Sequence, residues 1–237
     1  MRFPFRSAWR IAFIFVLVGC GEDYTHVRAR ADAIFMKAKA AVARGDHAES
    51  RRLLQQTILR DQQIGNTARL AEASLLLGEN YSAAADFDSA LTAFRLANVL
   101  YSRLADKPGM RAATLAIAGV HSTRGEGRLA YEVLRDALRL DEALGEREGA
   151  QTLKWPLIRA SRSILDPETE QRLLKELLLN ATAARDTTRI AKVRLEYGVF
   201  SLQRHDYESA ANSFRLSFSL AKANGDSLLI IETLSRL

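Results

Sequence analysis

Apolar residues recur at steps of three and four along most of the chain, and short polar breaks separate the apolar segments. In the segment before residue 44, Ala31, Phe35 and Ala38 fall on one face of a helix. Arg44-Gly45-Asp46 interrupts this pattern, and a second amphipathic segment follows. The pattern predicts a helix, a tight turn and a second helix.

This helix–turn–helix pattern repeats with a period of 40 residues. A fixed period between 20 and 50 residues with two helices in each period is typical of an α-solenoid, in which stacked hairpins bury the faces that one hairpin leaves uncovered. The sequence therefore predicts an all-α fold of five hairpins. The predicted repeats are 27–66, 67–106, 107–146, 147–186 and 187–226, and residues 227–237 are predicted as a capping helix or the start of a sixth repeat.

Two series of turn residues carry the period. Aspartate is favoured at turns because its carboxylate accepts hydrogen bonds from free backbone N–H groups and suits the positive end of a helix dipole. These aspartates are therefore predicted as caps rather than as catalytic or metal-binding groups, and Asp46 with Glu49 is predicted to form a capping box. The two series are Asp46, Asp86, Glu126, Asp166 and Asp206, and Gly65, Ala105, Gly145, Arg185 and Gly225.

Small residues mark the places where the two helices of a hairpin approach closely. In the fifth repeat, Gly198 and Ala210 are predicted to lie at the crossing, with Phe214 filling the space beside them. The fourth repeat departs from this design, because Ile158 and Glu170 stand where other repeats have small residues. Pro156 lies inside its first predicted helix, where the missing N–H should kink or shorten the helix.

The second and fifth repeats resemble the tetratricopeptide repeat (TPR), and the other three match it less well. The resemblance is carried by Leu77, Gly78, Tyr81, Ala90, Phe94 and Ala97, which follow the spacing of that family. It implies a right-handed superhelix whose concave face is lined by the first helix of each repeat and binds peptides or protein segments. On this chain that face would include Phe35, Lys39, Leu75, Glu79, Leu115, Trp155, Arg159, Leu195 and Val199.

A second interpretation of the leucines on that face stays open. Leu75, Leu115 and Leu195 are also the residues expected in the core between neighbouring repeats. Trp155 beside Pro156 is the most suggestive position for a local pocket, because an aromatic residue on a kinked helix can be presented to a ligand.

Residues 1–19 have the pattern of a secretory signal peptide. Basic residues precede the apolar run 11–18, which is too short to span a bilayer. The run ends in Leu17-Val18-Gly19-Cys20, which resembles the bacterial lipobox and implies an acylated N-terminal Cys20. Residues 20–26 would then form a polar tether. The alternative is a short anchor helix in which Cys20 is incidental.

Composition limits the remaining functions. Hydrophobic residues make up 48% of the chain and charged residues 26%, as in ordinary folded proteins. The formal charge of +6 falls to +3 without Arg2, Arg6 and Arg10 of the leader, and the other charges are interspersed, so nucleic-acid binding is not expected. No histidine or cysteine pattern for a metal, no nucleophile motif and no phosphate-binding loop is present. We therefore expect no enzyme activity, no cofactor and no small-molecule substrate.

These observations favour a lipid-anchored scaffold of the bacterial cell envelope that binds a protein or peptide partner. In a Gram-negative cell, the periplasmic face of the outer membrane is the favoured location. The alternative is the N-terminal sensor region of a longer signalling or protease-like protein that continues beyond Leu237.

Overall fold

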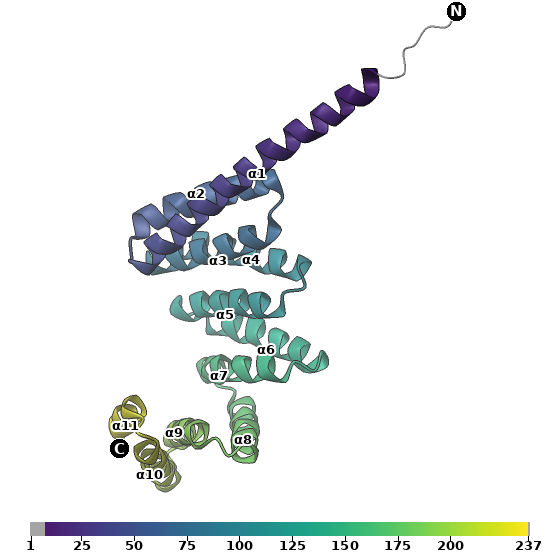
Figure 1. The fold of residues 1–237 in the computed structure, drawn as a ribbon. Helices are drawn as coiled ribbons and strands as arrows, with labels where there is room; N and C mark the ends of the chain where they lie inside the picture. The colour runs from purple at the N-terminus through teal and green to yellow at the C-terminus, as the bar shows by residue number, and fades with distance from the viewer. Residues whose placement is uncertain (1–7, 237) are drawn as a thin grey trace, which may run out of the picture. The chain divides into compact units, whose positions relative to one another are not determined.

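The computed structural model describes the backbone of residues 8–236 and the side chains of residues 25–236, and its ordered elements are all helices. This confirms the predicted all-α fold of hairpins followed by a terminal helix (Figure 1). The helices are α1 (Ala8–Ala43), α2 (His47–Ile64), α3 (Thr67–Ala83), α4 (Phe87–Arg103), α5 (Lys107–Thr123), α6 (Gly127–Ala143), α7 (Arg147–Ser163), α8 (Pro167–Ala183), α9 (Thr187–Gln203), α10 (Tyr207–Asn224) and α11 (Ser227–Leu234).

The chain divides into two compact units, Met1–Val120 and His121–Leu237, which are described separately below. The boundary falls near the end of α5, so the first unit contains α1 to α4 and most of α5. The second unit contains α6 to α11, where the sequence placed its fourth and fifth repeats.

The turns show that the geometric unit is 20 residues long, half the period seen in the sequence. Each turn has one residue with positive φ, and these residues are spaced by 20 from 45 to 225. The N–H that follows the positive-φ residue closes the turn, as where Asp86 N donates to Tyr81 O over 2.9 Å. The positive-φ residues are Gly45, Gly65, Ala85, Ala105, Gly125, Gly145, Leu165, Arg185, His205 and Gly225.

The predicted aspartate caps are confirmed. An Asp or Asn side chain at the N-cap accepts a hydrogen bond from the N–H three residues later at positions 46, 66, 86, 106, 166, 186, 206 and 226. Glu126 and Glu146 stand at the same position without a side-chain cap bond. Glutamate has one more methylene than aspartate, which moves the carboxylate away from the N–H, and Glu126 instead pairs with Arg124 and His121.

Two predictions of local structure were wrong. Glu49 does not complete a capping box, because Asp46 N already donates to Ala41 O and the Glu49 carboxylate binds Arg52 at 2.7 and 2.8 Å. Pro156 does not shorten its helix, because α7 has the same 17 residues as α3, α5 and α9. Packing around α7 therefore outweighs the loss of one helical hydrogen bond.

The core of each unit is built where the helices of a hairpin meet. In the first unit, Phe94 of α4 lies against Gly78 of α3, and a Cβ at Gly78 would lie 2.5 Å from the ring. In the second unit, Phe214 of α10 lies against Gly198 of α9 in the same way, and Ala210 is buried beside them. The predicted pairing of a small residue with an aromatic ring is confirmed in both hairpins.

The predicted leader is only partly described. Residues 8–43 form one continuous helix, so the backbone of the predicted tether 20–26 is helical. The rest of the predicted signal peptide and the side chain of Cys20 lie outside the described residues. Within the part of the chain that was searched, no helix combines the length and apolar character needed to cross a bilayer.

Candidate functional site

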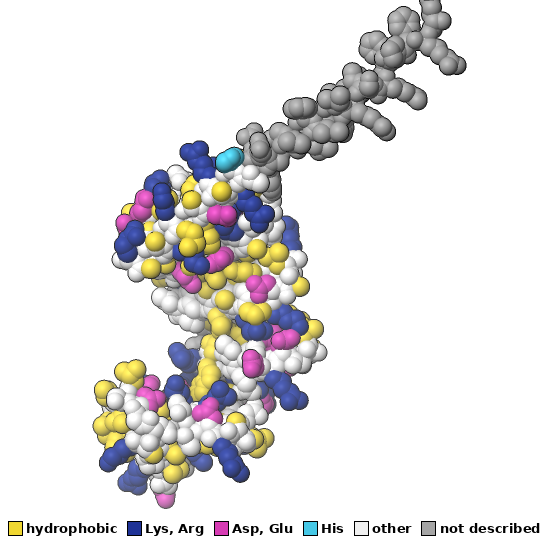
Figure 2. Space-filling view, in the orientation of Figure 1, with side chains coloured by type: hydrophobic (Ala, Val, Ile, Leu, Met, Phe, Trp, Pro, Cys, Tyr) yellow, Lys and Arg dark blue, Asp and Glu magenta, His cyan; other side chains and the backbone are white. Residues whose placement is uncertain are grey.

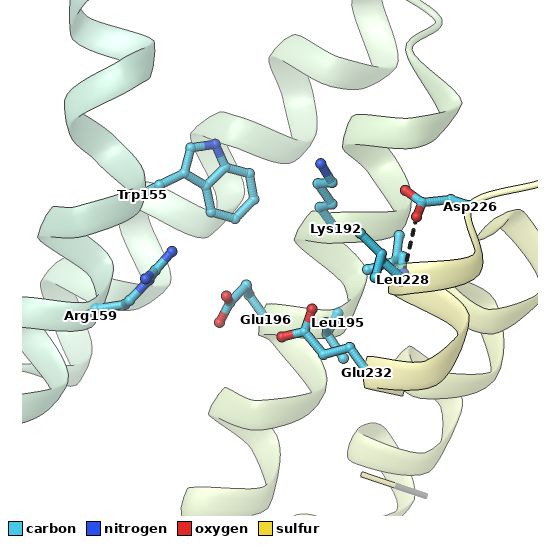
Figure 3. A pocket seen from close by; sticks show the side chains of 9 residues that line it. Trp155, Arg159, Lys192, Leu195, Glu196, Asp226, Leu228 and Glu232 are labelled. Carbon is cyan, nitrogen blue, oxygen red and sulfur yellow. Dashed lines mark hydrogen bonds between the residues drawn. The ribbon is translucent and has the colours of Figure 1, made fainter. Parts of the chain in front are cut away.

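A groove in the second unit is lined by the alternate helices α7, α9 and α11. Its volume is about 540 Å³, and it is called the α7–α9–α11 groove below. Its lining residues are Trp155 and Arg159 of α7, Lys192, Leu195 and Glu196 of α9, and Asp226, Leu228, Leu229 and Glu232 at α11 (Figure 3).

Helical spacing brings these side chains to one side of each helix. Trp155 and Arg159 are four residues apart on α7, as are Lys192 and Glu196 on α9. In Figure 3 the indole of Trp155 points away from α7 toward α9, and Glu232 points from α11 toward the same space. The groove therefore has an aromatic wall on α7 and charged groups on all three helices.

Two of the acidic groups in the groove already have partners. The Glu196 carboxylate binds Arg162 Nη1 at 2.8 Å, and Asp226 caps α11 by accepting from Leu229 N at 3.0 Å. Within the described part of the chain, Arg159, Lys192 and Glu232 make no ion pair. Two cations and one carboxylate are thus available to a ligand.

Arg162 fixes the floor of this region. It bridges three helices, because it binds Glu170 of α8 at 2.5 Å as well as Glu196 of α9. The side chain of Glu170 is 3% exposed, and its burial raises the pKa of the carboxyl while Arg162 opposes that rise. The residue that made the fourth repeat look irregular is therefore one half of a buried ion pair.

A second cavity, of about 310 to 430 Å³ depending on how far it is followed, lies in the first unit beside α3. Its charged groups are already paired. Arg69 binds Asp61 and Asp32, and Lys39 binds Glu72 at 2.9 Å. Because these charges satisfy one another, this cavity offers less to a ligand than the groove of the second unit.

Comparison with known proteins identifies the fold. No protein-family model and no curated protein matches the sequence. Among solved structures, the kinesin-light-chain-like, nearly identical TPR-like repeats of Podosopora anserina match with a TM-score of 0.68 at 14% identity, over 82% of this chain and 96% of that one. This chain has a TPR-like fold.

Two further TPR-like neighbours are BtubC (BKLC) from P. vanneervenii and aspartyl phosphate phosphatase F from Bacillus subtilis. BtubC has a TM-score of 0.70 at 15% identity, over 86% of this chain and 84% of its own. The phosphatase has a TM-score of 0.64 at 11% identity, over 87% of this chain and 57% of its own. At these identities the likeness concerns the fold alone.

The TPR-like arrangement brings three of the predicted site residues together. Trp155, Arg159 and Leu195 all line the α7–α9–α11 groove. Leu195 is nevertheless only 4% exposed and belongs to the core of the last hairpin, and Val199 packs half-buried against that core. The structure thus favours a core role for Leu195, while Trp155 and Arg159 remain accessible.

The other predicted site residues lie in the first unit. Phe35 is buried in the core between α1 and α2, although it borders the second cavity. Leu75 and Leu115 are half-buried on α3 and α5, whereas Lys39 and Glu79 are exposed. These residues are spread over three helices, and none of them belongs to the α7–α9–α11 groove.

Sequence reasoning missed Lys192, Asp226 and Glu232. Each lies on a first helix of a hairpin, so counting along those helices could have found them, but their convergence depends on how α9 and α11 are rotated. The described residues contain no cluster of three or more groups able to hold a metal ion. On the face shown in Figure 2, basic and acidic side chains are interspersed.

Proposed function

We propose that this protein is a scaffold for protein–protein interaction and that the α7–α9–α11 groove holds a segment of its partner. The observation that carries the proposal is the groove itself, where an accessible tryptophan stands beside charges that have no partner in the described chain. Tryptophan and arginine are the residues that most often dominate binding at protein interfaces.

The chemistry of the groove favours a peptide segment with an apolar anchor and charged flanks. Trp155 and Leu228 provide apolar surface for the anchor. Arg159 and Lys192 favour acidic groups beside it, and Glu232 favours a basic group on the α11 side. Charges of both signs fix the direction in which a segment lies more than they add to its affinity.

A comparison of variants in the full chain tests this proposal. Wild-type protein, Trp155→Ala and Leu179→Ala would each be used to capture partners from detergent-solubilised envelopes of the host, with quantitative mass spectrometry as readout. Leu179 is the matched control, because it is 71% exposed on α8, outside the groove. We expect one set of proteins to be lost with Trp155→Ala and kept with Leu179→Ala. Equal capture by all three proteins would refute the groove as the binding site.

Fluorescence gives a direct second readout. Trp9 and Trp155 are the two tryptophans of the chain, so a Trp9→Phe background makes Trp155 the sole emitter. Titration with peptides tiled from a captured partner should shift the Trp155 emission for one segment. Arg159→Glu should weaken that segment if its acidic groups contact α7.

We further propose that the protein is lipid-anchored through Cys20 in a bacterial cell envelope, at the periplasmic face of the outer membrane if the cell is Gram-negative. The support is the lipobox-like run that ends in the single cysteine of the chain. Acyl chains contribute about 0.8 kcal/mol for each buried methylene, so two or three chains suffice for stable anchoring.

The anchor is tested separately from the groove. Cys20→Ala should release the protein from membranes while its circular dichroism stays helical, and the intact mass of the native protein should equal residues 20–237 plus acyl chains. Membrane attachment that persists in Cys20→Ala would contradict the anchor. A much larger mass would instead support the alternative of a longer regulatory protein.

A further inference from the structure

The last helix carries a row of exposed aliphatic side chains. Leu228, Ile231 and Leu234 are 81%, 65% and 53% exposed, and their spacing of three places them on one side of α11. They are called the α11 stripe below. The other side of α11 packs on α10, where Leu229 is buried and Thr233 lies 3.3 Å from Ser217. Figure 2 shows hydrophobic side chains gathered over this helix.

The repeat identifies what this side of the helix contacts elsewhere. Forty residues before Ile231 stands Ala191 of α9, which is fully buried and whose carbonyl accepts a hydrogen bond from Ser217 of α10 at 2.8 Å. In the first unit the equivalent residue is Ala71 of α3, also fully buried, in a cluster with Ala97 of α4. In both hairpins this side of the first helix is covered by the second helix.

The size of the residues is reversed on α11. The earlier hairpins have small residues on the first helix, such as Ser74 and Gly198, and aromatic rings on the second. The α11 stripe has Ile231 and Leu234 at positions equivalent to Ala71 and Ser74. A helix with large rings at the contact would be held away from α11, whereas a helix with small residues there would fit closely.

We propose that the α11 stripe docks an amphipathic helix of a partner protein, with Ala, Ser or Gly at i, i+3 or i+4, and i+7. The partner helix takes the place of the second helix of a hairpin. A second copy of the chain fits less well, because it would bring the same large residues against themselves. Two copies of the stripe would also bury on the order of 600 Å², well below the ~1,200 Å² of a standard stable interface.

The proposal extends the scaffold function but does not require the groove to be the main site. Leu228 borders the groove, whereas Ile231 and Leu234 do not line it. Variants at Ile231 and at Trp155 therefore separate the two surfaces.

The test uses two synthetic helical peptides and the full chain in detergent. One 18-residue amphipathic peptide carries alanine at i, i+3 or i+4, and i+7 of its contact row, and its matched control carries phenylalanine there. We expect the alanine peptide to bind at least ten times more tightly than the phenylalanine peptide, by fluorescence anisotropy. Ile231→Glu should weaken that binding at least tenfold, while Leu179→Glu and Trp155→Ala leave it unchanged.

Three outcomes would overturn the proposal. They are equal binding of both peptides, no effect of Ile231→Glu, and no binding of either peptide. Circular dichroism checks that Ile231→Glu remains folded, and Leu228→Ser offers a milder variant with the same expected direction. Light scattering of the wild-type protein completes the test, because a dimer that Ile231→Glu dissociates would assign the stripe to a second copy instead.

Discussion

The ring of Phe94 lies against Gly78 so closely that a Cβ on the glycine would stand 2.5 Å from the ring carbons Cδ1 and Cε1. The same relationship recurs 120 residues later between Phe214 and Gly198, in the other unit. The close approach of the two helices in each hairpin therefore depends on the absence of a single methyl group.

We predict that Gly78→Ala destabilises the protein. Alanine favours a helix over glycine by about 1 kcal/mol, but the new methyl collides with the Phe94 ring, and overpacking of this kind costs about 1–3 kcal/mol. The free energy of unfolding should therefore fall, as measured by urea denaturation. Phe94→Leu in the Gly78→Ala background should recover part of the loss.

Gly119→Ala is the matched control for this variant. Gly119 is also helical, but a Cβ there would have no neighbour within 4 Å. The substitution should raise the free energy of unfolding by roughly 0.5–1 kcal/mol. A similar gain for Gly78→Ala would mean that the Phe94 ring yields easily and that the contact is not tight.

The hairpins and their contacts could be predicted from sequence because they depend on local rules. Gly78 and Phe94 follow from the spacing of small and large residues, and the caps follow from aspartate at the turns. The 20-residue geometric unit was hidden, because its positive-φ position is occupied by glycine at Gly45 but by Ala85 and His205 in equivalent turns. A turn that tolerates five different residue types at one position leaves no simple sequence signal.

The candidate site was predictable in part. Trp155 and Arg159 were identified from their place on a first helix, but Glu232 was not, because its position depends on the packing of α11 against α10. The role of Glu170 was also hidden, since its partner Arg162 lies eight residues earlier across a turn. Contacts made by tertiary packing leave weaker traces in a sequence than contacts within one helix.

Arg162→Met should be strongly destabilising at neutral pH. It leaves the carboxylate of Glu170 buried without its partner, and breaking one side of a buried ion pair typically costs about 3–5 kcal/mol. The double variant Arg162→Met/Glu170→Gln should recover much of the loss, because it removes the unpaired charge. Denaturation of the two single variants and the double variant gives the coupling energy.

The pH dependence of that loss identifies its cause. Burial raises the pKa of Glu170 above its ordinary value of 4.5, against the opposing effect of Arg162. A raised pKa means that the folded state binds the proton more tightly, so stability is highest below pH 4.5 and declines as pH rises through the folded-state pKa. Without Arg162 that pKa rises further, and the deficit of Arg162→Met should shrink toward pH 4.5. A deficit that stays constant with pH would point to lost packing instead.

Asp166→Ala should destabilise the start of α8. Asp166 accepts hydrogen bonds from Thr169 N at 3.1 Å and from the Tyr131 hydroxyl at 3.0 Å. Loss of such a cap typically costs about 1 kcal/mol. Asp166→Asn should retain most of the stability, because asparagine caps equally well, and equal losses for both variants would contradict a capping role.

The charge of Asp166 has its own pH signature. Burial opposes its ionisation, but the hydrogen bonds from Thr169 and Tyr131 outweigh burial and lower the pKa below its ordinary value of 3.8. A lowered pKa stabilises the folded state above pH 3.8, and this contribution disappears as pH falls through the folded-state pKa. The decline of stability below pH 4 should therefore be shallower in Asp166→Asn than in the wild-type protein.

Pro156→Ala should stabilise the fold but weaken the site. The substitution restores a backbone N–H in the middle of α7, and proline in a helix interior costs about 3 kcal/mol relative to alanine, so a gain of about 1–2 kcal/mol is expected after partial compensation by packing. A proline also restricts the backbone of the residue before it, here Trp155, whose indole forms the wall of the α7–α9–α11 groove. Releasing that restraint should change the emission of Trp155 and reduce partner capture.

Thr152→Ala is the control that separates stability from binding. Thr152 is exposed on the same helix, outside the groove, and its hydroxyl bonds only back to Glu148 O. Because alanine is the better helix former, this variant should also be more stable than the wild-type protein while capturing its partner normally. If Pro156→Ala likewise gains stability and captures the partner as well as Thr152→Ala does, then the proline has no part in shaping the groove, and Trp155 is positioned by side-chain packing alone.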